Sequence, residues 1–135
     1  MNPIIPSINY HITKACNMKC KFCFATFNDL GVVKHDLKQS KKIISEVAKS
    51  GFTKITFAGG EPTLVKELPE IVKYAKELGL ITTIVTNGAK LSQRGLLDRL
   101  APHLDWIALS IDTLNHDLNL KNLSKQLDQA RVKEI

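Results

Sequence analysis

Residues 54–62 read Lys-Ile-Thr-Phe-Ala-Gly-Gly-Glu-Pro, and this stretch is where the prediction of the fold begins. Its first five residues, 54–58, are a short β-branched and aromatic run, which is typical of a strand. Apolar residues recur at helical spacing on both sides, over residues 36–50 and 68–78. The stretch is therefore predicted to be a strand set between two helices, with a glycine-rich turn at its carboxyl end.

The same alternation continues in both directions along the chain. Further strands are predicted over residues 8–13, 80–86 and 106–110. Ser92 can cap a short helix over residues 92–100, and a last amphipathic helix is predicted over residues 120–130. Strands that begin near residues 54, 81 and 106 leave room for a crossover helix between them, so they suit βαβ units and a parallel sheet.

Polar or glycine-rich residues follow all four predicted strands. These are the cysteines, Gly59-Gly60-Glu61-Pro62, Asn87-Gly88, and Ser110 with Asp112. A (β/α) barrel builds its active site at this end of its strands, which favours a partial TIM-like α/β barrel of about four parallel units over a doubly wound sheet. We expect residues 1–135 to form one incomplete barrel domain, because four strands cannot close a barrel. Its open edges suggest a partner chain or a second copy.

Composition and charge narrow the class of protein. The chain has 135 residues, 44% of them apolar, and no apolar run near the ~20 residues that a membrane span needs. Its three cysteines lie within eight positions and no export signal is evident, so a reducing cytoplasm is expected. The first 42 residues hold seven Lys and two Asp, so a partner that is an anion fits, as does a solvated helix face. Direct nucleic-acid binding is not expected, because arginine is scarce, with three in the chain, and no aromatic stacking platform interleaves the lysines.

Cys16-x3-Cys20-x2-Cys23 is the sharpest motif in the sequence. Thiolates select zinc, copper(I) or iron–sulfur clusters, and three of them would leave one position of a cluster open. A structural zinc ion would instead recruit His11 or His35 as a fourth ligand. Chance clustering of free cysteines is the third interpretation. No histidine has a partner pattern, so no catalytic residue is assigned.

Together, Cys16-x3-Cys20-x-Phe22-Cys23 and the Gly59–Pro62 turn resemble the radical S-adenosylmethionine (SAM) superfamily. The resemblance implies that Cys16, Cys20 and Cys23 hold a 4Fe-4S cluster, with SAM on the open iron. It places Phe22 beside the adenine of SAM. It also places the turn, with Gly59, Gly60 and Glu61, at the methionyl amino group, where a carboxylate suits an ammonium.

A narrower resemblance is to the viperin family of SAM-dependent nucleotide dehydratases. It is carried by four stretches in addition to the cysteine motif: residues 9–13, 54–57, 86–88 and 109–112. It implies a lyase that converts a nucleoside triphosphate to its 3′-deoxy-3′,4′-didehydro form for antiviral defence, with Asn87 and Ser110 beside SAM. It also implies a reducing electron donor of flavodoxin or ferredoxin type.

The sequence departs from this family in the tail, where residues 122–124 read Asn-Leu-Ser in place of Ile-Gly-Arg. Two alternatives therefore stay open beside the nucleotide dehydratase. One is another radical SAM reaction, such as protein activation or peptide modification. The other is a non-catalytic relative that binds metal.

Overall fold

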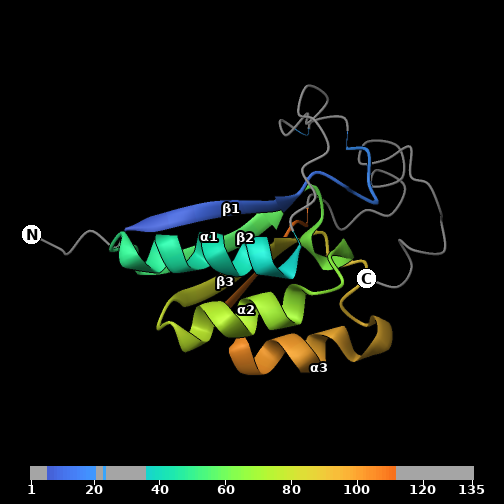
Figure 1. The fold of residues 1–135 in the computed structure, drawn as a ribbon. Coiled ribbons are helices and arrows are strands. Elements are labelled where there is room, and N and C mark those ends of the chain that lie inside the picture. The colour runs from blue at the N-terminus through green and yellow to red at the C-terminus, as the bar shows by residue number, and fades with distance from the viewer. Residues whose placement is uncertain (1–5, 21–22, 24–35, 112–135) are drawn as a thin grey trace, which may run out of the picture.

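The computed structural model describes residues 6–20, 23 and 36–111, and a four-stranded sheet organises this part of the chain (Figure 1). The strands are β1 (Ser7–Thr13), β2 (Lys54–Gly59), β3 (Ile81–Thr86) and β4 (Trp106–Leu109). The helices are α1 (Leu37–Lys49), α2 (Leu68–Glu77) and α3 (Leu96–Leu100). Three short 3₁₀ turns are η2 (Pro62–Leu64), η3 (Gln93–Gly95) and η4 (Ala101–His103). All four predicted strands and the first two helices are confirmed to within one residue, whereas the predicted helix over 120–130 lies outside the described residues.

The prediction of one helix over residues 92–100 is wrong in its first half. The chain forms the 3₁₀ turn η3 there, and the α-helix begins only at Leu96. Gly95, the last residue of η3, has a φ of +61°, a left-handed conformation that an α-helix cannot contain, so α3 begins after it. Ser92 makes no capping hydrogen bond through its side chain, so its predicted role as the helix cap is also wrong.

The sheet is parallel, and its strands lie in the order β1-β2-β3-β4. Because each crossover moves to the next strand in the same direction, right-handed connections place every helix on one face. Figure 1 shows α1, α2 and α3 along that face. This is the arrangement of a partial barrel. The doubly wound alternative, which needs helices on both faces, is not found in the described part of the chain.

The hydrophobic core lies between the sheet and this helical layer. Alternate residues of β2, Ile55 and Phe57, point into it and are fully buried. They meet Ile44 of α1 and Ile71 of α2, which are also fully buried. Burying each such side chain contributes about 1.5–3 kcal/mol, so this packing holds the strands against the helices.

Strand β4 is exposed on both faces. Its four residues are all exposed, and Trp106 keeps 66% of its surface accessible. β1 and β4 are the two edges of the sheet in the described part of the chain, as the sequence predicts for an unclosed barrel. None of the described helices is both long and apolar enough to cross a membrane.

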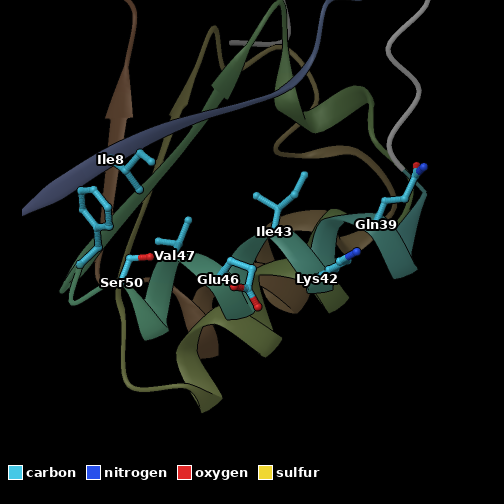
Figure 2. A pocket seen from close by; sticks show the side chains of 8 residues that line it. Ile8, Gln39, Lys42, Ile43, Glu46, Val47 and Ser50 are labelled. Atoms are coloured by element: carbon cyan, nitrogen blue, oxygen red, sulfur yellow. The ribbon is translucent and has the colours of Figure 1, made fainter.

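A shallow groove of about 560 Å³ lies between α1 and the edge strand β1 (Figure 2). Apolar side chains, among them Ile8, Ile43 and Phe52, line it, together with the charged Lys42 and Glu46 of α1. This part of the lysine surplus therefore lies on the helical layer, which supports the interpretation of a solvated helix face. Lys41, on the same helix, packs over the ring of Tyr74 at 5.1 Å.

Asp105 braces the opposite edge of the sheet, just before β4. Its carboxylate accepts hydrogen bonds from Lys76 Nζ at 2.6 Å and from the main-chain N–H of Thr82 at 2.8 Å. The Lys76 ammonium, helped by the Thr82 N–H, holds the pKa of the Asp105 carboxyl below its usual range. Lys76 is on α2 and Thr82 on β3, so one carboxylate joins a helix, a strand and the entry to the next strand.

This brace predicts how stability depends on pH. Because the pKa of Asp105 is lowered in the folded chain, its contribution is present above the unfolded pKa of about 4. The contribution is then lost as pH falls through the folded pKa. We expect Asp105→Asn to lose about 1 kcal/mol of unfolding free energy at pH 7, since both partners are partly exposed to solvent. The difference from wild type should shrink towards pH 3 in urea unfolding curves, and the exposed Asp98, changed to Asn, serves as the control. An equal loss at both pH values would contradict the assignment.

Candidate functional site

A cavity of about 300 Å³ opens where the four strands end at their carboxyl edge. Eight of the nine predicted site residues line it: Cys16, Cys20, Cys23, Gly59, Gly60, Glu61, Asn87 and Ser110. The ninth, Phe22, lies outside the described residues. Residues that follow four different strands are thus brought together at one cavity. The cavity also takes in His11, Met18, Ala58, Val85 and Thr86.

The three thiols occupy one side of this cavity, on the segment that follows β1. Cys16 and Cys23 are exposed and Cys20 is half-buried. The Sγ of Cys16 accepts a hydrogen bond from the Met18 N–H at 3.3 Å, and the Cys23 N–H donates to the Cys20 carbonyl at 3.2 Å. Although Cys16 as a residue is exposed, the protein around its thiol displaces part of the surrounding water and raises the pKa of the thiol, while that hydrogen bond opposes the shift. Binding a metal there must therefore displace a proton.

As a donor set, three thiolates facing a common cavity fit a soft metal or an iron–sulfur cluster. Within the described ranges, no three His, Cys, Asp or Glu side chains are already gathered closely enough to hold a metal ion. The thiolates would therefore have to converge as the group binds. His11 lines the same cavity, as the zinc alternative requires, but His35 lies outside the described residues.

The glycine turn packs against the start of the cysteine segment. The Gly60 N–H donates to the Thr13 carbonyl at 2.8 Å, and the Glu61 N–H donates to the Ala15 carbonyl at 2.8 Å. A Cβ on Gly60 would stand 2.2 Å from the Ala15 oxygen, and Gly59 has a φ of +144°. The glycines are thus required for close approach to the chain's own backbone, a use that the sequence alone did not indicate.

The Glu61 carboxylate has a structural task that the sequence analysis did not anticipate. It is 1% exposed and accepts hydrogen bonds from four donors of the chain. Its Oε1 bonds the Thr63 N–H at 3.0 Å, the Thr63 hydroxyl at 2.5 Å and the Thr86 hydroxyl at 2.6 Å. Its Oε2 bonds the Asn87 N–H at 2.8 Å. The carboxylate therefore ties the β2 turn to the end of β3.

The main-chain N–H of Asn87 donates to Glu61, and the Asn87 side chain makes two further hydrogen bonds. Its Oδ1 accepts from the Ala89 N–H at 3.1 Å, and its Nδ2 donates to Oδ1 of Asn17 at 2.8 Å. Asn17 lies between the first two cysteines and was not among the predicted site residues. Ser110, just after β4, is placed by its N–H, which donates to the Thr86 carbonyl at 2.9 Å.

Three functional or supporting residues were missed by the sequence analysis: Asn17, Thr63 and Thr86. Thr63 could have been found, because Glu61 accepts from its N–H as the cap of the 3₁₀ turn η2, and a capping side chain two residues ahead is a local signal. Asn17 and Thr86 pair with partners 70 and 25 residues away, so no local pattern could show them.

The chain is similar to known proteins over most of its length. A family model described as the radical SAM superfamily matches residues 10–135. Over 122 residues the chain is 51% identical to an S-adenosylmethionine-dependent nucleotide dehydratase of Lacinutrix mariniflava, covering 87% of this chain and 25% of that protein. A protein of the same name from Flammeovirga pacifica is 49% identical over 123 residues, covering 87% and 42%.

Solved structures show the same fold. SuiB of Streptococcus suis, bound to S-adenosylmethionine, matches with a TM-score of 0.71 at 27% identity, over 88% of this chain and 26% of that chain. The chain therefore spans less than half the length of each of these three proteins. The family model nonetheless covers β2 to β4, most of β1 and every residue that lines the cavity, and by that match the chain belongs to the radical SAM superfamily.

Proposed function

We propose that this chain binds a 4Fe-4S cluster through Cys16, Cys20 and Cys23, and SAM in the cavity beside them. One observation carries the proposal: the three thiols share a cavity with the Gly59–Gly60 turn, Asn87 and Ser110. Thiolates are the ligands that such clusters take, and three of them leave one iron open to a further ligand. The proposal is supported by the superfamily match, which includes all three cysteines.

Each side of the cavity has a distinct task in this proposal. When bound and reduced, the cluster supplies the electron that cleaves SAM to methionine and a 5′-deoxyadenosyl radical. Gly59 and Gly60 offer main-chain carbonyls to the SAM ammonium, and Glu61 holds their turn in place through its buried carboxylate. Asn87 and Ser110 offer polar groups to the rest of SAM, and Phe22 an aromatic face for the adenine. The walls of the cavity would shield the 5′-deoxyadenosyl radical from water and from side reactions.

For the reaction, we propose dehydration of a nucleoside triphosphate to its 3′-deoxy-3′,4′-didehydro form. Support comes from the two relatives at 49–51% identity, both named nucleotide dehydratases. A role in antiviral defence, a cytoplasmic setting and a flavodoxin- or ferredoxin-type electron donor belong to the same proposal. The positive charge of the chain, +6, suits a triphosphate substrate.

The direct test is anaerobic reconstitution of the chain with iron and sulfide. About four irons per chain and a reduced EPR signal that SAM perturbs are expected for a site-differentiated cluster. Incubation with each nucleoside triphosphate, SAM and dithionite, followed by mass spectrometry, should then show 5′-deoxyadenosine and a nucleotide lighter by one water. A chain that takes up zinc alone, or whose EPR signal ignores SAM, would contradict the proposal. Cleavage of SAM without a nucleotide product would instead favour another radical SAM reaction.

A further inference from the structure

Asn17 is the residue of the cysteine segment that the structure connects most directly to the far side of the cavity. It follows Cys16, and only 9% of its surface is accessible. Its Oδ1 accepts from Asn87 Nδ2 at 2.8 Å, across 70 residues of sequence. This bond satisfies the buried amide oxygen of Asn17, which would cost about 1–3 kcal/mol to bury unpaired.

The partner of Asn17 is itself fixed from two directions. The Asn87 N–H donates to Glu61 Oε2 at 2.8 Å, and its Oδ1 accepts from the Ala89 N–H at 3.1 Å. The amide of Asn87 is therefore oriented before it meets Asn17, with its Nδ2 directed at the cysteine segment. Hydrogen bonds arranged in such a chain fix one geometry and reinforce one another.

The start of the cysteine segment is attached to β2 as well. The Ala15 carbonyl accepts from the Glu61 N–H, and the Thr13 carbonyl accepts from the Gly60 N–H. The backbone just before Cys16 thus rests on the β2 turn, while the residue just after Cys16 is bonded to the β3 turn. Glu61 joins these two turns, so Cys16 lies between two anchors of one network.

We propose that Asn17 is a positioning residue, whose hydrogen bond to Asn87 locks the Cys16–Cys20 segment onto the turn after β3. The inference rests on the proposed function in one respect, that SAM is bound between these two segments. In this proposal Asn17 contacts neither the cluster nor SAM. It acts through Asn87 and Cys16, and it couples the order of the thiol side to the order of the SAM side.

Four variants test the lock: Asn17→Ala, Asn87→Ala, the double variant, and Lys19→Ala as the matched control. Lys19 is exposed and lies in the same segment, so it reports the cost of shortening a side chain there. In cluster-loaded protein, SAM affinity is titrated through the EPR signal, and iron per chain is counted in parallel. Asn17→Ala should retain its iron and bind SAM about five- to tenfold more weakly.

The double variant separates a lock from two independent effects. Because both changes remove the same hydrogen bond, it should bind SAM no more weakly than Asn87→Ala alone. A merely structural role would lower stability or iron content and leave the SAM affinity of loaded chains unchanged. Additive losses, or an Asn17→Ala affinity within twofold of wild type, would overturn the inference. If Asn17→Ala does not fold, Asn87→Ala breaks the bond from its other end, and the readout is then the exchange of the main-chain amides of residues 16–20, because Asn87 is itself proposed to contact SAM.

Hydrogen exchange in the metal-free chain keeps this inference distinct from the proposed function. Main-chain amides of residues 16–20 should exchange several-fold faster in Asn17→Ala than in wild type or Lys19→Ala. Unchanged exchange would overturn the lock. A wild-type chain that binds no cluster would contradict the proposed function alone, and the exchange rates would still decide whether the lock exists.

Discussion

A chain carrying Cys20→Ala is expected to fold as wild type does and to retain less than about one iron in place of about four. Cys20 is half-buried on the wall of the cavity and outside the hydrophobic core, so its loss removes a ligand without removing packing. The sequence has three cysteines in all, so no other thiol can take its place. Iron analysis and the EPR signal after anaerobic reconstitution measure the loss.

The matched control for this variant is Met18→Ala. Met18 lies between the same two cysteines and lines the same cavity, but its thioether is a weak ligand beside a thiolate. We expect Met18→Ala to keep most of its iron. Urea unfolding of both metal-free variants should coincide with wild type to within about 0.5 kcal/mol. Full iron retention in Cys20→Ala would mean that other side chains hold the metal.

Glu61→Ala is expected to lower the free energy of unfolding by about 3 kcal/mol, even with no cofactor present. The change leaves the N–H groups of Thr63 and Asn87 without the acceptor that they share, a carboxylate that is 1% exposed. The hydroxyls of Thr63 and Thr86 can turn elsewhere, but the two main-chain donors cannot. Urea denaturation of the metal-free chain gives the difference directly.

Two further variants sharpen this result. Glu61→Gln keeps one carbonyl acceptor and turns an NH₂ group towards a donor, so it should lose about half as much stability. Glu67→Ala removes an exposed carboxylate with no capping hydrogen bond, and we expect a change within about 0.5 kcal/mol. If Glu61→Ala unfolds at the wild-type urea concentration, the buried carboxylate has no structural task.

Much of the fold could be predicted because each strand carries its own local signal. The β-branched run over 54–58 and the helical spacing over 68–78 need no knowledge of tertiary contacts. A parallel sheet of the partial-barrel type was also expected, since polar or glycine-rich residues follow all four strands. The predicted start of the third helix was wrong because the left-handed conformation of Gly95 decides where α3 begins. Apolar spacing does not reveal a single left-handed residue.

The candidate site likewise has a part that local motifs predict and a part that depends on tertiary contacts. Cysteine spacing and the Gly-Gly turn are local motifs, and the structure brings them to one cavity as expected. The task of Glu61 could not be foreseen, because a carboxylate next to a ligand site and one that ties two strands together look alike in sequence. Asn17 is recognised only through its partner, and that pairing exists only once β1 and β3 stand in register on either side of β2.

The strictly sequential order of the strands has a consequence for folding during synthesis. Each new strand pairs with the one made just before it, so a nascent chain leaving the ribosome can add one strand and helix at a time to an existing edge. The cavity draws on the ends of all four strands, and Ser110 lies beyond the last. A ligand that needs all four sides of this cavity can therefore bind only after β4 and Ser110 have been synthesised.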